Sequence, residues 1–392
     1  MRFLIILISV FFIAGCKHSD VKVNIQKDID SIVHRWVPDQ REGICIVNLS
    51  PLSAGKFLIK GETNLPEAKA EIINYLVNYG YEYSDSLLII PDKTRIEKPW
   101  GLVSLSVCNI KKNPSHSSEL VSQSIMGTPV KILKKKGGWL LIQTPDYYIG
   151  WVNSSGIAEL NEQEISNWKR SERVIYIRKS GEILFESGND RVLSDIVSGS
   201  ILEVKAKKNS TYEVMLPDGR RGILNKTDVA DFRQWSSDAF PDADKLIHFS
   251  KLLLGSPYLW GGTSTKAIDC SGFVKTIYFT SGIILARDAS QQFLHGIPVE
   301  YSSSSDSLRK GDLIFFGYNN KGVKRITHVG MYIGDTEVIH SSGMVRINSL
   351  DSTRTNFSKY LKDSMMGVRR IIGTESGKGV ERIVNHNWYL SK

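Results

Sequence analysis

The stretch GSPYLWGGTSTKAIDCSGFVKTIYFTSG, residues 255–282, carries the clearest local signal in the C-terminal region. Gly-Gly-Thr at 261–263 indicates a loop, and Asp269 is a suitable N-cap for a helix that begins at Cys270. Apolar residues then recur at helical spacing, and Gly282 ends the pattern. Cys270 is therefore expected at a helix N-terminus, where free N–H groups and the helix dipole favour a thiolate and lower the pKa of the thiol.

Two histidines further along the chain can complete a catalytic group with this cysteine. His328 lies in ITHVGMYIG, where apolar residues alternate with others as in a strand, and His340 follows twelve residues later in EVIHSSG. The turn at Gly334-Asp335 predicts an antiparallel hairpin that brings the two histidines side by side. His328 would then act as the base for the thiol, and His340 would orient the ring of His328.

Each of these residues also has a plain structural interpretation. A lone cysteine at a helix start is more often a small packing residue, and a lone histidine on a strand is usually a hydrogen-bonded polar residue. Zinc is a weaker alternative because Cys270, His328 and His340 lack the close spacing of CxxC or HxxxH motifs. The remaining histidines are interpreted as surface or packing residues: His18, His34, His116, His248, His295 and His386.

The order of short motifs in this region resembles the NlpC-type cell-wall cysteine peptidases. The motifs are PYLWGG, DCSGFV, RDASQQ, GDLIFF, THVGMYIG and VIHSSG, within about residues 250–372. The resemblance implies a papain-like α+β fold with Cys270 as nucleophile, His328 as base and His340 as the orienting residue. It also implies hydrolysis of the peptide stems of murein, typically between γ-D-glutamate and a diamino acid, without a metal or an organic cofactor.

Two segments in the middle of the chain repeat each other. Residues 127–153 and 199–225 align without gaps at an offset of 72, with a glycine, a Pro-Asp pair and a second glycine at matching positions. Each copy predicts strand, basic turn, strand, Pro-Asp turn and strand. Two copies indicate two small barrels rather than a solenoid, which needs at least three repeats. Both resemble bacterial SH3-like barrels, and generic similarity between hairpins is the alternative.

The N-terminal sequence MRFLIILISVFFIAGC is typical of an export signal. Its apolar run is too short to span a membrane comfortably, and small residues precede Cys16. The resemblance to a bacterial lipobox implies that Cys16 is lipidated and becomes the mature N-terminus; an ordinary export signal is the alternative. We expect a lipoprotein exported to the periplasmic face of the outer membrane, with which Lys17 after the cysteine is compatible.

Composition and charge limit the partners of the chain. It has 392 residues and a net charge of +9, which fits an anionic polymer such as cell wall or an anionic membrane surface. The basic residues are dispersed, apart from a short run at 134–136, so a nucleic-acid partner is not expected. Cys45 and Cys108 lie in strand-like stretches, where each is either a buried small residue or half of a disulfide.

The whole arrangement is similar to the γ-D-glutamyl-L-diamino acid endopeptidases of murein-peptide recycling, whose substrates carry a free N-terminal L-alanine. The expected organisation is a signal peptide (1–15), a lipidated tether (16–30), a small α/β domain (31–95), two SH3-like barrels (96–160 and 161–231), a linker (232–245), the NlpC-type domain (246–375) and a C-terminal tail (376–392). The fold class is α+β.

This resemblance also assigns substrate contacts. By position, Asp288 in RDASQQ would bind the ammonium group of the alanine, a role that suits a carboxylate. Some members have serine directly after this aspartate, whereas here Ala289 intervenes, so either the amine contact rests on Asp288 alone or Ser290 substitutes. Tyr148 of the first barrel would close the pocket. The plain alternatives are a helix cap for Asp288 and a surface position for Tyr148.

Three residues around the nucleophile would complete the pocket. Tyr258 in SPYLWGG would line it, and its hydroxyl would help to stabilise an oxyanion; a core aromatic is the alternative. Asp269 and Ser271 flank Cys270 and would contact the stem peptide. Two other functions are kept as alternatives: an endolytic hydrolase of intact, cross-linked wall, and a wall-binding lipoprotein with an inert C-terminal domain.

Overall fold

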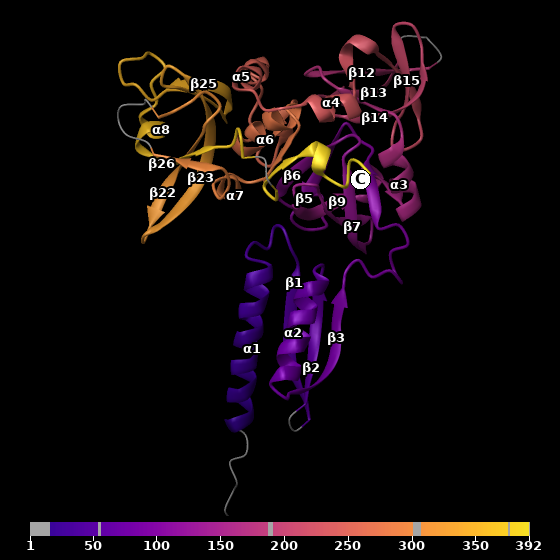
Figure 1. Cartoon of the computed structure of the whole chain (residues 1–392), viewed down its shortest axis with the longest axis vertical. Helices are drawn as coiled ribbons and strands as arrows, with labels where there is room; N and C mark the ends of the chain where they lie inside the picture. Colours follow the sequence, from indigo (N-terminus) through magenta and orange to yellow (C-terminus); the bar gives the residue numbers. More distant parts are fainter. Residues whose placement is uncertain (1–15, 54–55, 187–190, 301–306, 375–376, 392) are drawn as a thin grey trace, which may run out of the picture. The chain divides into compact units, whose positions relative to one another are not determined.

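The computed structural model describes residues 16–53, 56–186, 191–300, 307–374 and 377–391, in two compact units, Met1–Asp92 and Lys93–Lys392 (Figure 1). The expected signal peptide, residues 1–15, lies outside the described residues. Among the helices of the described part, none combines the length and the apolar character that crossing a membrane requires.

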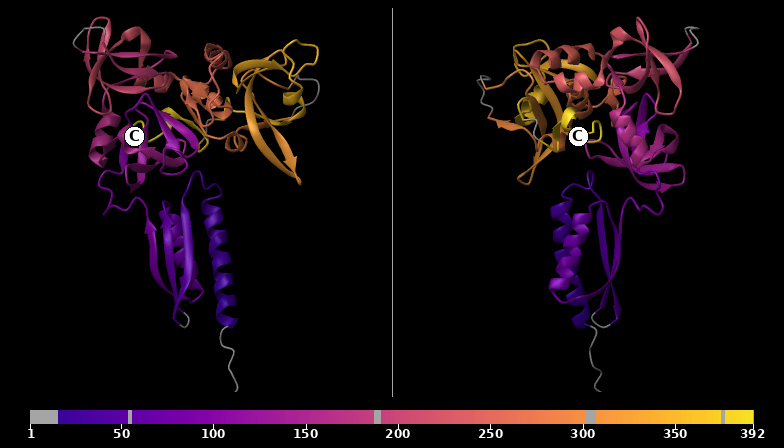
Figure 2. Two further views of the ribbon diagram at one scale, coloured as in Figure 1. Left: turned by 180° about the vertical axis from the view of Figure 1, so that it is seen from behind. Right: turned by 45° about the vertical axis from the view of Figure 1, so that its right-hand side comes forward.

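The first unit is a three-stranded sheet with two helices on one face (Figure 2). The strand order is β1-β2-β3, antiparallel between β1 and β2 and parallel between β2 and β3, with α2 as the crossover. Pro66 is the first residue of α2, a position that proline suits because the first turn of a helix does not need its missing N–H. The elements are α1 (Cys16–Trp36), β1 (Cys45–Ser53), β2 (Lys56–Thr63), α2 (Pro66–Asn78) and β3 (Glu82–Ile89).

The expected tether at 16–30 is wrong, because α1 continues through it to Trp36. Ile25, Ile29 and Ile32 are buried in the core of the unit. Their spacing of four and three residues places them on one helical face, so this helix packs on the sheet although most of its residues are polar. The sequence carried this signal, but the polar composition obscured it.

The second unit begins with two seven-stranded barrels of the same topology. Their strand orders, β10-β4-β7-β8-β9-β5-β6 and β17-β11-β14-β15-β16-β12-β13, correspond strand for strand. The predicted repeat is confirmed: β8 and β15, like β9 and β16, differ by the offset of 72 residues. The first barrel comprises β4 (Trp100–Val103), β5 (Val107–Lys111), β6 (Leu120–Ile125), β7 (Pro129–Lys136), β8 (Trp139–Gln143), β9 (Ile149–Asn153), η1 (Ser154–Gly156) and β10 (Ile157–Leu160).

Helix α3 (Glu162–Arg170) connects the barrels and begins with a capping box between Asn161 and Glu164. The second barrel comprises β11 (Arg173–Tyr176), β12 (Ser180–Phe185), β13 (Val192–Val197), β14 (Ile201–Lys207), β15 (Thr211–Met215), β16 (Arg221–Asn225), η2 (Lys226–Asp228) and β17 (Val229–Asp231).

The rest of the unit packs helix α6 (Cys270–Thr280) against a six-stranded sheet of order β21-β26-β22-β23-β24-β25. The sheet strands are β21 (Ile297–Val299), β22 (Leu313–Asn320), β23 (Val323–Gly334), β24 (Glu337–Ser342), β25 (Met344–Ser349) and β26 (Met365–Arg370). The smaller elements are α4 (Phe232–Asp238), α5 (Ala243–Leu252), β18 (Thr263–Ser264), β19 (Ala267–Ile268), β20 (Ile283–Leu285), α7 (Ala289–Gln292), α8 (Lys359–Asp363), β27 (Val380–Arg382) and η3 (Ile383–Asn385).

Two further expectations about this unit are wrong. The linker at 232–245 is largely helical, and Phe232 at the start of α4 is buried. The C-terminal tail at 376–392 contains β27, which pairs with β20, and its Trp388 and Tyr389 are buried with Trp100 of the first barrel. These segments are structured because they bury aromatic side chains between the barrels and the C-terminal domain.

The cysteines at 45 and 108 are both free and buried, each in the core of a different unit. Of the two alternatives, the small buried residue is therefore correct. Burial raises the pKa of both thiols, that of Cys108 to about 12, so neither is a reactive thiolate at neutral pH.

Candidate active site

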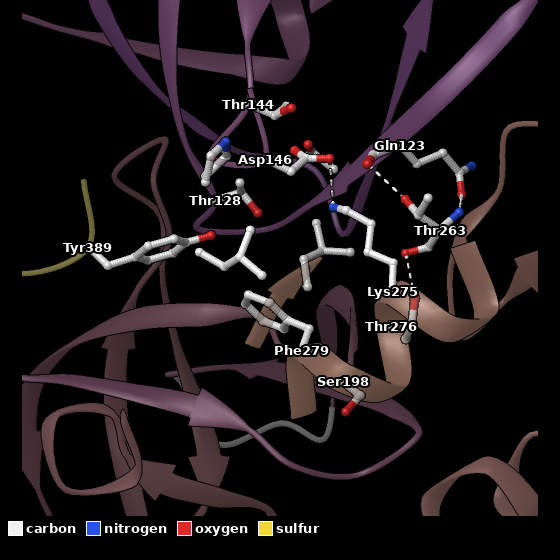
Figure 3. A pocket seen from close by; sticks show the side chains of 14 residues that line it. Gln123, Thr128, Thr144, Asp146, Ser198, Thr263, Lys275, Thr276, Phe279 and Tyr389 are labelled. Carbon is white, nitrogen blue, oxygen red and sulfur yellow. Dashed lines mark hydrogen bonds and ion pairs between the residues drawn. The ribbon is translucent and has the colours of Figure 1, made fainter. Parts of the chain in front are cut away.

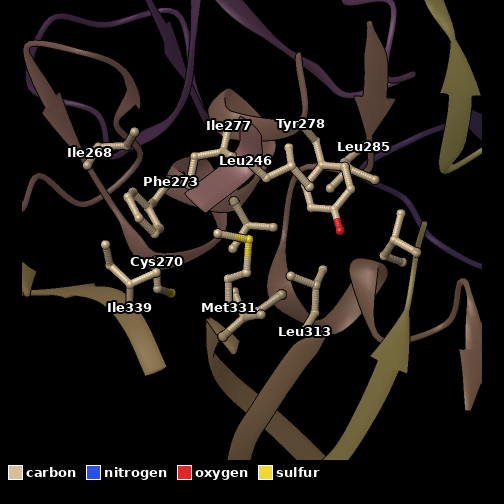
Figure 4. Close-up of a cluster of buried hydrophobic side chains, with 14 of the residues drawn as sticks. Leu246, Ile268, Cys270, Phe273, Ile277, Tyr278, Leu285, Leu313, Met331 and Ile339 are labelled. Atoms are coloured by element: carbon tan, nitrogen blue, oxygen red, sulfur yellow. The ribbon is translucent and has the colours of Figure 1, made fainter. Parts of the chain in front are cut away.

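Cys270 is the first residue of α6, as the sequence predicts, and Asp269 caps this helix by accepting a hydrogen bond of 2.7 Å from the N–H of Gly272. Figure 4 shows Cys270 in the hydrophobic cluster between α6 and the sheet, with Phe273 and Ile339. The side chain is only 7% exposed. Its thiol faces the backbone N–H groups of Ser271 and Val329, which places it beside the strand that carries His328.

The two histidines meet across the predicted hairpin. Nε2 of His328 on β23 and Nδ1 of His340 on β24 are 2.8 Å apart, with the two rings nearly perpendicular at 86°. Since Nε2 of His328 is used in this bond, Nδ1 is the ring nitrogen that remains for the thiol. Nε2 of His340 in turn lies 3.0 Å from Oδ1 of Asn348 on β25.

Gly330 makes this close approach of the strands possible. A Cβ atom at this position would lie 2.5 Å from a methyl carbon of Val338 and 3.0 Å from Cβ of His340. Only a residue without a side chain fits there, since such contacts would push β24 away from β23. The glycine thus sets the spacing at which the rings of His328 and His340 can hydrogen bond.

Burial favours the neutral forms of Cys270, His328 and His340. Burial lowers the pKa of His328 to about 3, with a further contribution from His340, and burial also lowers the pKa of His340. Burial, followed by the charge of Asp269, raises the pKa of Cys270 to about 11. The expected lowering of this pKa by the helix N-terminus is wrong, because desolvation outweighs the backbone N–H groups.

A buried ion pair holds the residues before and after the nucleophile. Arg287 is 1% exposed; its Nη2 donates to Oδ2 of Asp269 at 2.6 Å, and its Nη1 to Oγ of Ser271 at 3.0 Å. Asp269 also accepts from the N–H of Gly261. The structure therefore places Asp269 and Ser271 beside the nucleophile, with side chains engaged inside the protein; their contact with a stem peptide stays a prediction.

Tyr258 lies next to the thiol, since Cys270 and Asp269 both act on its hydroxyl group. Burial is the main cause that raises its pKa to about 12, followed by these two residues. Its backbone N–H donates to the carbonyl of Gly343, which fixes the loop against the turn between β24 and β25. The hydroxyl keeps its proton at neutral pH and can donate a hydrogen bond to an oxyanion.

The first barrel contributes Tyr148 to the same region. Its hydroxyl lies 3.3 Å from Oδ2 of Asp288, and its side chain is buried. The preceding residue, Tyr147, has a φ of 67°, a conformation that Gly219 adopts at the equivalent position of the second barrel. Asp288 also caps α7 together with Gln291, which confirms the alternative prediction that it is a helix cap. This role does not exclude a contact with the substrate. Ser290 is partly exposed on the same helix.

Comparison with known proteins fits this arrangement. Residues 255–370 match the NlpC/P60 family, and residues 110–157 match the bacterial dipeptidyl-peptidase Sh3 domain. A γ-D-glutamyl-L-lysine dipeptidyl-peptidase of Bacillus cereus is 32% identical over 292 residues, which are 72% of this chain and 84% of the relative. The chain belongs to the NlpC/P60 family.

Further relatives agree with this assignment. A γ-D-glutamyl-L-lysine dipeptidyl-peptidase of Bacillus subtilis is 28% identical over 249 residues, 61% of this chain and 78% of the relative. The crystal structure of an NlpC/P60 family protein from Bacillus cereus superimposes with a TM-score of 0.61 and 26% identity, covering 70% of this chain and 99% of the other. The predictions of a cysteine peptidase of this family, and of an α+β fold with SH3-like barrels, are confirmed.

The first barrel and the NlpC/P60 domain make polar contacts at β18 and along α6. The backbone N–H and the hydroxyl of Thr263 donate to the Oε1 and the backbone carbonyl of Gln123. Lys275 on α6 reaches Asp146 of the first barrel at 3.2 Å, beside a cavity of about 60 Å³ (Figure 3). None of Cys270, His328 and His340 lines this cavity, so it belongs to the domain interface rather than to the catalytic group.

Sequence reasoning missed two residues of this NlpC/P60 site, Arg287 and Asn348. Arg287 follows the apolar run Gly-Ile-Ile-Leu-Ala, and this context could have predicted that the arginine is buried. A buried arginine requires a carboxylate partner. Asn348 gave no signal, because its contact depends on the register of β24 with β25. His386, interpreted as a surface or packing residue, is buried and lies 3.0 Å from the carbonyl of Pro145.

Proposed function

We propose that this protein is a lipoprotein that hydrolyses the γ-D-glutamyl–diamino acid bond of murein stem peptides with a free N-terminal L-alanine. The observation that carries the proposal is the contact between Tyr148 of the first barrel and Asp288 of the NlpC/P60 domain. It supports a pocket closed on one side by the barrel, with a carboxylate placed for an ammonium group. The names of the relatives, γ-D-glutamyl-L-lysine dipeptidyl-peptidases, support the same bond.

The proposed reaction begins with a neutral thiol and a neutral imidazole. As the sulfur of Cys270 attacks the γ-carbonyl carbon, Nδ1 of His328 takes the proton of the thiol. Backbone N–H groups at the start of α6 and the hydroxyl of Tyr258 stabilise the oxyanion. His328 then gives its proton to the departing amine, which leaves a thioester on Cys270. Water, deprotonated by His328, hydrolyses the thioester and regenerates the thiol. His340 holds the ring of His328 throughout.

Recognition of the free amine is assigned to Asp288. A carboxylate that accepts hydrogen bonds from an ammonium group forms a strong charge-assisted contact, whereas an acetylated amine offers no charge. Tyr148 already contacts this carboxylate and would limit the space beyond the alanine. Ser290, on the same short helix, is the candidate for a second hydrogen bond to the substrate.

The anchoring of the protein is part of the proposal and rests on the sequence alone. Lipidation of Cys16 would hold the enzyme at the periplasmic face of the outer membrane, where released stem peptides are available. Two lipid chains suffice for stable anchoring without a transmembrane helix. Labelling with a radioactive fatty acid, lost in a Cys16→Ala variant, tests this part separately.

The decisive experiment compares L-Ala-γ-D-Glu-L-Lys with its N-acetylated form. We expect kcat/KM to fall by about 10- to 100-fold on acetylation, since the carboxylate of Asp288, whose side chain is 27% exposed, loses its charged partner. Equal rates on both peptides, or release of peptides from intact wall, would favour the endolytic alternative. Full activity of a Cys270→Ala variant would refute the mechanism, and no activity of the wild type on any stem peptide would favour the inert wall-binding lipoprotein.

A further inference from the structure

The side-chain amide of Asn348 has its orientation fixed by a loop carbonyl. Nδ2 of Asn348 lies 3.0 Å from the backbone oxygen of Asn356. A carbonyl oxygen can only accept a hydrogen bond, so the NH₂ group must face it. The backbone N–H of Ser349 donates to the same oxygen at 2.9 Å, which holds this acceptor in place. Oδ1 of Asn348 is therefore the atom that faces Nε2 of His340.

This orientation determines where the proton of His340 resides. Oδ1 can only accept, and it lies 3.0 Å from Nε2 of His340, so Nε2 carries the hydrogen. A neutral imidazole has one N–H and one lone pair, and burial keeps this imidazole neutral by lowering its pKa. Nδ1 of His340 must then be an acceptor. The hydrogen bond with Asn348 raises the pKa of His340 and the positive charge of Arg346 lowers it, but burial is the largest cause and the pKa stays below its ordinary value.

The tautomer of His340 in turn fixes that of His328. Nδ1 of His340 lies 2.8 Å from Nε2 of His328, so Nε2 of His328 must donate and carries the hydrogen. The lone pair of His328 is then on Nδ1, the ring nitrogen that remains for the thiol of Cys270. With the opposite tautomer, an N–H would face the thiol and no base would be present.

We propose that Asn348 is a positioning residue that, through His340, fixes His328 as the Nε2–H tautomer with the lone pair of Nδ1 available to Cys270. Three hydrogen bonds in series, from the carbonyl of Asn356 to His328, all point the same way. The proposal extends the catalytic roles proposed above and rests on them for its kinetic consequences. Its statement about tautomers does not depend on the substrate.

The direct test is NMR of the wild-type protein with ¹⁵N-labelled histidine, with the two resonance sets assigned through His328→Gln and His340→Gln. We expect both rings as Nε2–H tautomers at neutral pH, distinguished by the nitrogen shifts and long-range couplings of each ring. An Nδ1–H tautomer at either ring would overturn the proposal. This measurement needs no substrate and no variant of Asn348.

The kinetic test uses three variants of the NlpC/P60 domain in the full chain. Asn348→Ala removes the acceptor, so we expect kcat/KM on L-Ala-γ-D-Glu-L-Lys to fall about 10- to 100-fold, mainly in kcat, with mixed tautomers at His328. Asn348→Asp keeps an oxygen acceptor and adds a negative charge, so we expect most of the activity to return and the acid limb of the pH profile to move upward. Asn356→Ala is the matched control, because it removes the bond to Glu337 and leaves the backbone carbonyl in place.

We expect Asn356→Ala to keep kcat/KM within about threefold of the wild type. A loss of activity that is equal in Asn348→Ala and Asn356→Ala, or an Asn348→Ala variant as active as the wild type, would contradict the proposal. The outcome is separable from that of the proposed function. If the nucleophile or the substrate differs from the proposed one, the tautomers measured by NMR stay the same. If the tautomers differ from the proposed ones, activity still requires Cys270.

Discussion

Replacement of Arg287 by methionine tests how much the buried ion pair beside the nucleophile stabilises the fold. The guanidinium is fully enclosed and bonds Asp269, Ser271 and, through Nε, Ser122 of the first barrel at 3.0 Å. Removing it leaves the carboxylate of Asp269 with the backbone N–H groups of Gly261 and Gly272 and the hydroxyl of Ser271 as donors, and with no positive charge from Arg287. Breaking a buried pair by removing one partner costs about 3–5 kcal/mol.

The size of the effect in a thermal experiment follows from the size of the unit. The unit Lys93–Lys392 is larger than the domains for which 1 kcal/mol shifts Tm by about 2–4 °C, so the lower figure applies. We therefore expect Arg287→Met to lower the Tm of this unit by about 6–10 °C in calorimetry. Arg178→Met is the matched control: its ion pair with Asp228 is 3.0 Å long, against 2.6 Å for Arg287 with Asp269, but the Arg178 side chain is 56% exposed. An exposed pair contributes at most about 1 kcal/mol.

A double-mutant cycle with Asp269→Asn isolates the pair itself. Since the two residues are in direct contact, we expect a coupling free energy of at least about 1 kcal/mol between Arg287→Met and Asp269→Asn. A stabilising role of the buried pair would be contradicted if Arg287→Met lowered Tm no more than Arg178→Met, or if the effects of the two changes at the buried site were additive.

Four shorter predictions concern the catalytic region. Gly330→Ala should lower the free energy of unfolding by about 1–3 kcal/mol in urea titrations and reduce kcat, because the added methyl group displaces β24; unchanged values would contradict the close approach. Tyr148→Phe should raise KM for the free-amine peptide about three- to tenfold through loss of its bond to Asp288, while kcat stays within twofold. Alkylation of Cys270 by iodoacetamide should be slower than that of free cysteine at pH 7 and rise up to pH ~11, because burial raises the pKa of this thiol; fast alkylation at pH 7 is the contrary result. Stability should fall as pH drops from about 6.5 toward 3, since unfolded His328 binds a proton that the folded ring does not, and His328→Gln should flatten this slope.

The local elements of the catalytic region were predictable from the sequence, because their signals are local. A cap and apolar spacing mark the helix at Cys270, and a glycine-containing turn joins the strands of His328 and His340. The barrels were predictable because the repeat doubles the evidence for each strand.

Features that depend on distant contacts were not predictable. The pKa of Cys270 is raised, whereas the sequence predicted that it is lowered. The N–H groups at the helix start lower this pKa, but burial by the rest of the fold raises it by more. The role of Asn348 depends on strand register, and the enclosure of Arg287 depends on the approach of the first barrel. The helical segment at 16–30 was missed for a different reason, since its three isoleucines are sparse among polar residues.

The segment after the catalytic sheet has a consequence for the order in which the protein assembles. Trp388 stacks edge-on against Trp100 of the first barrel at 5.3 Å, and the carbonyl of Tyr389 accepts a hydrogen bond of 2.8 Å from Arg173 of the second. Since these residues follow the NlpC/P60 domain along the chain, these two contacts can form only after the whole domain has been synthesised. Other contacts, such as that of Arg287 with Ser122, join the first barrel to the domain without this segment. The last residues of the chain therefore add a second attachment of the barrels to the peptidase domain, one that a truncation before Trp388 would remove.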